Sequence, residues 1–290
     1  MSAAFADRLI GRARALGAPL CVGLDPYPAR IPGLFGQGLA AAEAFSLEIL
    51  ALAQPHAVAL KPQSALFEAL GWEGVRLLGQ LIAEARNLGL PVILDAKRGD
   101  IGATAEGYAQ AALGPAPGFD ADAVTVSPYM GRDSLEPFLA LAQARGKGVA
   151  ALLRTSNPGA ADLQDLDAGG QPLWARTAQL LAPAQARLLG ASGWSGLMAV
   201  VGATAPEEAR RARALLPQAL FLVPGYGAQG AGAAAALAGF VRTPHGLEGG
   251  VVNASRAVLY PPAAERAPNL AAWRACVAEA MAAAALELRT

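Results

Sequence analysis

Cysteine and histidine are scarce in this sequence of 290 residues, and their scarcity excludes several kinds of protein. The two cysteines, Cys21 and Cys276, lie far apart, and the two histidines, His56 and His245, are isolated from one another. No zinc or iron–sulfur ligand spacing is present, and two cysteines are too few for a disulfide-rich scaffold. We therefore expect no metal site and no cofactor that depends on cysteine or histidine ligands.

Charge is also sparse and balanced, with 23 basic and 23 acidic residues and a charged fraction of 16%. This composition gives no reason to expect a nucleic-acid partner. The alanine-rich C-terminal stretch is interrupted by charged residues, and the charged N-terminal stretch has a helical pattern. Neither is typical of a membrane span or a signal peptide, so we expect a soluble, cytoplasmic protein.

Lysine is the rarest of the charged residues, since only Lys61, Lys97 and Lys147 occur beside twenty arginines. Lys61 and Lys97 fall at the ends of predicted strands, whereas Lys147 lies between two glycines and is predicted to be a surface residue. A lysine differs from an arginine because its compact ammonium group can give up a proton. The two strand-end lysines thus predict proton donation or Schiff-base chemistry, with a purely structural ion pair as the alternative.

The segment 91–101 contains the densest group of charges. Its apolar start is typical of a buried strand, and side chains alternate along a strand, so Asp95 and Lys97 should point the same way. Asp100 follows where the chain turns into a helix, which it could simply cap. A charge that is buried without a partner costs on the order of several kcal/mol, so a buried strand has no structural reason to carry this group. The group therefore indicates a functional site.

Strand-like and helical segments alternate along the whole chain. This alternation predicts an α/β fold, a (β/α)8 TIM barrel, and we expect residues 1–290 to form a single domain. The predicted strands are 20–25, 57–61, 91–97, 121–127, 148–153, 196–201, 219–223 and 250–252. The predicted helices are 2–16, 38–53, 73–88, 100–113, 132–145, 206–215 and 228–239, one within 159–192, and the final helices.

Polar residues gather at the carboxyl ends of these strands, which is the end where barrels of this type build their active sites. The loop after the seventh strand is rich in glycine and includes Pro224, Gly225 and Gln229. Glycines let successive backbone N–H groups face one point, as in phosphate sites, although any tight turn also needs them. Arg256, after the eighth strand, adds a guanidinium suited to phosphate. The two loops together predict a phosphate-bearing ligand.

Seven motifs, in order from the first strand to the eighth, resemble the family of orotidine 5′-phosphate decarboxylases in its longer bacterial form (type 2). The specific motif is Asp95-Ala96-Lys97-Arg98-Gly99-Asp100-Ile101. The others are Gly23-Leu24-Asp25-Pro26, Lys61-Pro62-Gln63, Ser127-Pro128-Tyr129-Met130-Gly131, Arg154-Thr155-Ser156-Asn157-Pro158, Val223-Pro224-Gly225-Tyr226-Gly227-Ala228-Gln229-Gly230 and Ala254-Ser255-Arg256. The resemblance covers nearly the whole chain.

The resemblance implies roles for individual residues. Lys97 would be the proton donor, and Lys61, Asp95 and Asp100 would complete a chain of charges with it. Asp100 and Thr104 would reach into the site of a neighbouring subunit, which implies a homodimer, although Thr104 could be an ordinary exposed helix residue.

The remaining implied roles concern substrate binding. Asp25 would bind a ribose hydroxyl, Ser156 the base, and Gln229 and Arg256 the phosphate of a nucleotide.

The implied reaction is the loss of CO₂ from orotidine 5′-phosphate to give UMP, without a cofactor. A phosphosugar lyase of the same barrel group, typically dependent on Mg²⁺, is one alternative. A non-catalytic barrel that binds a phosphoribosyl ligand is another. The lysine after the second strand argues against the first, since an acidic metal ligand would be expected there. Lys97 and its two aspartates argue against the second, because phosphate binding alone does not need them.

Overall fold

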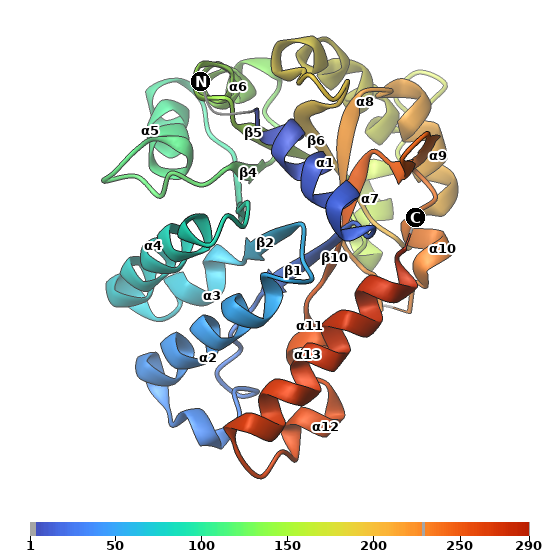
Figure 1. Cartoon of the computed structure of the whole chain (residues 1–290). Helices are drawn as coiled ribbons and strands as arrows, with labels where there is room; N and C mark the ends of the chain where they lie inside the picture. Colours follow the sequence, from blue (N-terminus) through green and yellow to red (C-terminus); the bar gives the residue numbers. More distant parts are fainter. Residues whose placement is uncertain (1–3, 228–229, 290) are drawn as a thin grey trace.

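A computed structural model describes residues 4–227 and 230–289 of the chain. Eight parallel strands form one sheet that curls into a nearly closed barrel with helices around it, so the predicted fold is confirmed (Figure 1). The strands are β1 (Leu20–Leu24), β2 (Ala59–Pro62), β3 (Ile93–Arg98), β4 (Ala123–Val126), β5 (Gly148–Arg154), β6 (Ser195–Val201), β7 (Ala219–Val223) and β10 (Gly250–Ala254).

The barrel closes between β2 and β3, the two ends of the hydrogen-bonded strand order. Here the pairing is reduced to single parallel bridges, Leu60 with Val92 and Gln63 with Asp95. The last of these bridges places the ends of β2 and β3 side by side, which matters for the site described below.

Helices cover the outside of the barrel between successive strands. The α-helices are α1 (Phe5–Leu16), α2 (Gly38–Ala53), α3 (Ser64–Glu68), α4 (Gly71–Asn87), α5 (Gly102–Leu113), α6 (Arg132–Arg145), α7 (Ala161–Gln164), α8 (Leu173–Leu181), α9 (Pro206–Leu215), α10 (Ala233–Ala236), α11 (Arg256–Leu259), α12 (Pro262–Glu265) and α13 (Leu270–Glu287). Short 3₁₀ helices are η1 (Gly33–Phe35), η2 (Pro158–Ala160) and η3 (Ala182–Leu188). Among the residues described, no helix is long and apolar enough to cross a membrane.

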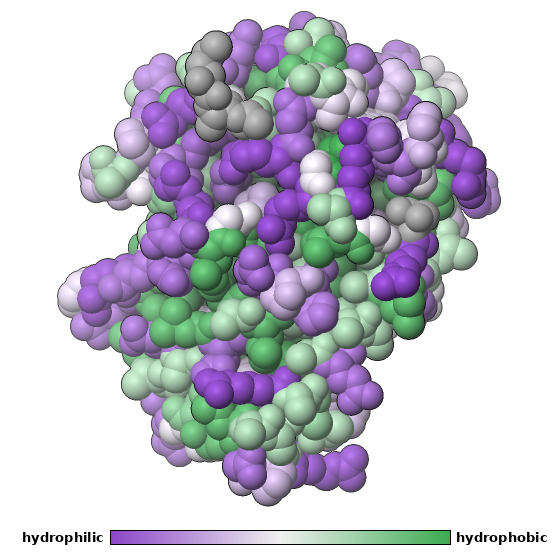
Figure 2. Space-filling view, viewed as in Figure 1, coloured by the Kyte–Doolittle hydropathy of each residue, from purple (hydrophilic) through white to green (hydrophobic). Residues whose placement is uncertain are grey.

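Alternation along the strands divides the core into two layers. On β5, Val149 faces the helices and belongs to the outer cluster, whereas Ala150 faces the interior and belongs to the inner cluster. Helix α1 completes the inner layer, because Phe5 and Leu9 pack onto interior residues and cover the amino-terminal end of the barrel. Figure 2 shows hydrophilic side chains over this part of the surface and more apolar ones over α2 and α13.

One predicted element is wrong. The sequence predicts a helix over 228–239, but the described part of this segment forms only the four-residue helix α10, and the antiparallel hairpin of β8 (Val241–Thr243) and β9 (Gly246–Glu248) follows. Gly227 and Gly230 have φ angles of 70° and 84°, which an α-helix cannot contain. The alanines had suggested a longer helix than these glycines allow.

Candidate active site

The backbone at the end of β3 departs from a regular strand. The pairing register with β4 shifts between Leu94 and Arg98, and Lys97 has a φ angle of 47°, in the left-handed region. The hydroxyl of Thr125 on β4 accepts hydrogen bonds from the backbone N–H groups of Ala96 and Lys97, at 2.9 and 2.8 Å. Bulges and strained residues of this kind concentrate at functional sites, where they aim a side chain.

The carboxylate of Asp95 is the centre of the site, with two donors on each oxygen. Its Oδ2 accepts hydrogen bonds from Lys61 Nζ at 2.8 Å and from Gln63 Nε2 at 3.1 Å. Its Oδ1 accepts from Lys97 Nζ at 2.6 Å and from Thr125 Oγ1 at 3.0 Å. Strands β2, β3 and β4 each contribute a side chain, so the carboxylate is held from three sides.

The two buried residues of this cluster, Asp95 and Lys61, are both ionised. Burial alone would raise the pKa of Asp95, but the charges of Lys61 and Lys97 outweigh it and hold that pKa well below its usual range. Burial would likewise lower the pKa of Lys61, but the charges of Asp95 and Asp25 raise it above its usual range. Lys97 differs in exposure, since 47% of its side chain is accessible against 6% for Lys61. The cluster therefore presents one ammonium group to a ligand.

Asp25 lies directly after β1 and is buried, and one of its carboxylate oxygens has no hydrogen-bond partner among residues 4–227 and 230–289. Asn253 on the neighbouring strand β10 is also buried, and its side-chain oxygen also lacks a partner within the described part of the chain. Buried acceptors are usually paired, so two unpaired ones on adjacent strands indicate places for water or for ligand hydroxyl groups. The sequence pointed to Asp25 but did not single out Asn253 as a site residue.

Ser156 follows β5 and is held close to β6. A side chain at Gly202 would place its Cβ only 2.8 Å from that of Ser156, so the glycine makes this approach possible. Nearby, Arg154 forms an ion pair with Asp165 at 3.2 Å, and the backbone N–H of Thr155 donates to Gln164 Oε1 at 2.9 Å. These bonds tie the loop after β5 to α7.

The loop after β7 begins with Pro224 and Gly225, whose φ angle of 98° suits only glycine. The phenol of Tyr226 in this loop donates a hydrogen bond to Glu287 on α13, and burial together with that carboxylate raises the pKa of the phenol. Arg256 is exposed at the start of α11. The predicted phosphate ligand Gln229 lies outside the described residues.

Two predicted site residues, Asp100 of the expected chain of charges and Thr104, lie apart from the Asp95 cluster. Asp100 accepts a hydrogen bond from the N–H of Ile101 at 2.9 Å, and among residues 4–227 and 230–289 it forms no ion pair. Thr104 is exposed on α5. The structure thus brings together Lys61, Asp95 and Lys97 and leaves Asp100 and Thr104 outside this cluster.

The fold and the site together define a (β/α)8 barrel enzyme whose reactive groups lie at the carboxyl ends of its strands. The model of the Orotidine 5'-phosphate decarboxylase / HUMPS family matches residues 18–267. The chain belongs to this family.

Individual relatives agree with the family match. The chain is 49% identical to the orotidine 5'-phosphate decarboxylase of Azoarcus sp. (strain BH72), over 83% of this chain and 84% of that protein. It is 45% identical to that of Haloarcula marismortui, over 88% of this chain and 87% of that protein. Among solved structures, a putative orotidine-monophosphate-decarboxylase from Toxoplasma gondii superposes with a TM-score of 0.80, at 34% identity over 97% of both chains.

Proposed function

We propose that this protein is a carboxy-lyase that converts orotidine 5′-phosphate to UMP and CO₂ in pyrimidine biosynthesis, with Lys97 as the proton donor and without a cofactor. One observation carries the proposal: Asp95 is buried and ionised between Lys61 and Lys97 at the carboxyl end of the barrel. The family of the chain and the names of its relatives support the same reaction.

The geometry suits the charges that this reaction develops. When CO₂ leaves, the electron pair of the broken C–C bond stays on a ring carbon, and an ammonium group beside it stabilises that charge and then supplies the proton. Asp95 and Lys61 are fixed before substrate binds, so Lys97 is held in place as well.

Asp95 also acts on the ground state. A substrate carboxylate about 4 Å from Asp95 would be repelled by about 4 kcal/mol at an effective dielectric constant of about 20. Binding energy from the distant phosphate can offset this repulsion.

The remaining predicted residues would act as ligands of the substrate. Asp25 and Ser156 would bind the ribose and the base. Pro224 and Gly225 start the loop that, with Gln229 and Arg256, would bind the phosphate. The positive φ angle of Gly225 turns the backbone there, which supports the phosphate role.

The active unit would be a homodimer in which Asp100 and Thr104 complete the neighbouring site. Exposed apolar side chains beside these residues support a partner surface, since Ile101 is 55% exposed, Tyr129 78% and Met130 42%. Mixing inactive Lys97→Ala and Asp100→Ala chains tests this arrangement. Random pairing makes about half of the dimers mixed, so about a quarter of all sites would regain both residues. Activity that stays at the parental level after confirmed subunit exchange would contradict shared sites.

A direct assay tests the reaction itself. The ultraviolet absorbance of orotidine 5′-phosphate should fall when enzyme is added, at the same rate with and without excess EDTA. Activity lost with chelator and restored by Mg²⁺ would assign the protein to the metal-dependent lyases instead. Binding of the nucleotide without turnover would make it a non-catalytic barrel. Cell fractionation would test the predicted cytoplasmic location.

A further inference from the structure

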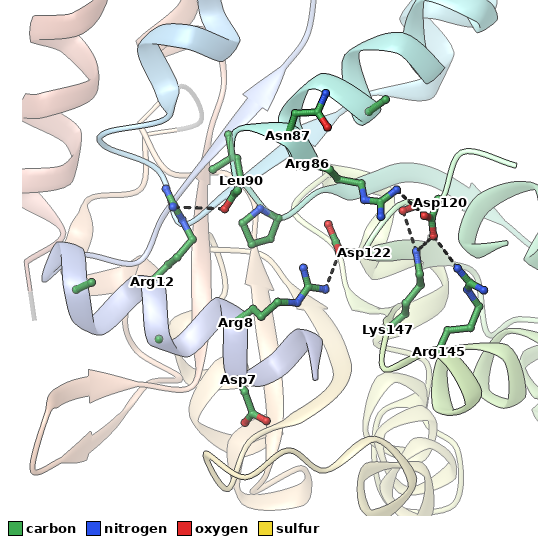
Figure 3. A pocket seen from close by; sticks show the side chains of 15 residues that line it. Asp7, Arg8, Arg12, Arg86, Asn87, Leu90, Asp120, Asp122, Arg145 and Lys147 are labelled. Carbon is green, nitrogen blue, oxygen red and sulfur yellow. Dashed lines mark hydrogen bonds and ion pairs between the residues drawn. The ribbon is translucent and has the colours of Figure 1, made fainter. Parts of the chain in front are cut away.

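A hollow of about 770 Å³ lies at the opposite end of the barrel from the proposed active site. It is bordered by α1, the last turns of α4 and the segments that lead into β3, β4 and β5 (Figure 3). Its size is within the range of about 300–1,000 Å³ that is typical of small-molecule sites. Five of its lining residues are cations, namely Arg8, Arg12, Arg86, Arg145 and Lys147.

The cations exceed the carboxylates that could neutralise them. Asp120 alone is shared by Arg86 at 2.5 Å, by Arg145 at 3.1 Å and by Lys147. Arg8 pairs with Asp122 at 2.6 Å, as Figure 3 shows. The group of cations around Asp120 therefore carries an excess of positive charge.

The third carboxylate among the lining residues does not reduce this excess. Asp7 accepts hydrogen bonds from the backbone N–H groups of Ala191 and Ser192, at 3.1 and 2.7 Å, and in Figure 3 it points away from the arginines. Arg12 adds a further cation, which donates to backbone carbonyls at Gln54 and Ala57 and has no carboxylate partner among the described residues.

Three of the arginines retain donors for a ligand. The side chains of Arg8, Arg86 and Arg145 are 35%, 43% and 32% exposed, and their ion pairs with Asp120 and Asp122 occupy only part of each guanidinium. A guanidinium has five N–H donors, so several remain on each. Guanidinium groups bind phosphate oxygens in bidentate fashion, and these three come from three different elements around the hollow.

Lys147 has a different task in this cluster. Its ammonium is buried and donates to Asp120 and to the carbonyl oxygen of Ala121 at 2.7 Å, so it holds the wall together and is not free for a ligand. The sequence prediction that Lys147 is a surface residue is wrong, because the segment before β4 folds over it. Lys147 fixes Asp120, whose carboxylate also pairs with the two arginines.

We propose that this hollow is a binding site for a polyphosphate anion, either inorganic or the phosphate chain of a nucleotide. An anion whose charge is spread over a chain of tetrahedral groups can meet several separated guanidinium groups at once. A single compact anion could reach only one or two of them. Nothing in this proposal depends on the reaction at the other end of the barrel.

Calorimetric titration of the full-length protein with tripolyphosphate tests the proposal. Ala83 on α4 lines the hollow and is exposed, so Ala83→Glu adds a carboxylate there without altering the core. Ala83→Gln is the matched control of equal size. Wild type and Ala83→Gln should bind with a Kd below about 1 mM, and Ala83→Glu should bind at least about tenfold more weakly. Arg86→Ala/Arg145→Ala should weaken binding by a similar factor.

Three further measurements test where the anion binds and which kind of anion the hollow prefers. Arg256→Ala should leave the affinity unchanged, which separates the hollow from the proposed phosphate loop. ATP that binds more tightly than tripolyphosphate would indicate a nucleotide, and equal affinity would indicate the phosphate chain alone. Citrate, a polycarboxylate, should bind more weakly than either. Equal binding of citrate, equal affinity of Ala83→Glu and Ala83→Gln, or no binding by wild type would each overturn the proposal.

Discussion

The two ends of the barrel carry the same electrostatic arrangement, an aspartate shared by several cations, built from different parts. At the carboxyl end Asp95 is shared by Lys61 and Lys97. At the amino end Asp120 is shared by Lys147 and two arginines. In each cluster one residue, Lys97 or Asp120, has a positive φ angle, 47° and 52°, and these are the non-glycine residues with positive φ in the described part of the chain.

The two clusters differ in the secondary-structure elements that carry their cations. Lys61 and Lys97 come from two adjacent strands, and further donors fix the carboxylate between them. Arg86 and Arg145 come from the ends of helices, and their side chains are partly exposed and free to adjust. Strands thus hold an ammonium at the proposed site of proton delivery, whereas helix ends present guanidinium groups at the proposed anion site.

Replacing one lysine at each end of the barrel should give the largest difference between the two clusters, in kcat at one end and in melting temperature at the other. Lys97→Ala should reduce kcat about a thousandfold or more while folding is kept, because its charge acts mainly in the transition state. Lys97→Arg should fail almost as badly, since arginine does not readily give up a proton. Lys147→Met should lower the melting temperature but leave the kcat of folded protein unchanged. Steady-state kinetics measures kcat, and thermal unfolding measures the melting temperature. A Lys97→Ala enzyme that kept a tenth of wild-type turnover would contradict the proposal that Lys97 is the proton donor.

Neutralising each aspartate without changing its shape compares the clusters in stability. Asp95→Asn removes the hydrogen-bonded counter-charge of the buried Lys61 ammonium, so the free energy of unfolding should fall by about 3–5 kcal/mol. Asp120→Asn should cost less, about 1–2 kcal/mol, because the partly exposed guanidinium groups regain water and the buried ammonium of Lys147 keeps the backbone carbonyl oxygens of Asp120 and Ala121 as acceptors. Urea unfolding of both variants gives the two values. Equal losses would mean that burial does not distinguish the clusters.

The pH dependence of stability sharpens the same comparison. The folded pKa of Asp95 is lowered, so its contribution is fully present above the unfolded pKa of about 4 and is lost as the pH falls further. The folded pKa of Lys61 is raised, so its contribution is present below about pH 10.4 and is lost as the pH rises above that value. The stability difference between wild type and Asp95→Asn should therefore be constant from about pH 5 to 9 and shrink below about pH 4. Urea unfolding of both proteins across this pH range measures the stability difference. A difference that shrinks near pH 7 would contradict the directions given for the pKa values of Asp95 and Lys61.

The smallest expected effect concerns the hydroxyl that has no counterpart at the amino end. Thr125→Val keeps the shape of the side chain but removes the acceptor of the Ala96 and Lys97 N–H groups and one donor to Asp95. Because Lys97 is then less well positioned, kcat should fall about tenfold with little change in KM. Thr125→Ser, which keeps the hydroxyl, should restore most of the rate. A Thr125→Ser enzyme as slow as Thr125→Val would show that the methyl group, and not the hydroxyl, matters.

The barrel and the cluster at the carboxyl ends of its strands could be predicted because both are encoded locally. Helices α2, α6 and α9 and strand β7 have the predicted boundaries, since each has a clear apolar pattern between breaks. Lys61, Asp95 and Lys97 were expected together because all parallel strands end at one face. A polar residue in an otherwise apolar strand was the available signal for Thr125.

The amino-terminal cluster could not be predicted, because its members lie in loops and helix ends. Asp120 and Lys147 are 27 positions apart and meet only after β4 and β5 have paired. Nothing in the local pattern distinguishes such a lysine from one in an exposed turn. The prediction of a helix after the seventh strand is wrong for a related reason. Alanine favours a helix, but the neighbouring glycines adopt backbone angles that a helix does not contain.

The scarcity of lysine gives the protein an unusual chemical property. Reagents that acylate amines modify many lysines on most protein surfaces, but here the surface cations are arginines, which do not react with them. Of the three lysines, Lys61 and Lys147 have side chains only 6% and 7% exposed, whereas Lys97 is 47% exposed. Apart from the α-amino group, such a reagent therefore meets one accessible amine, the proposed proton donor. An ordinary amine-labelling reaction is therefore expected to report on the proposed active site, and a bound ligand that covers Lys97 should reduce the degree of labelling.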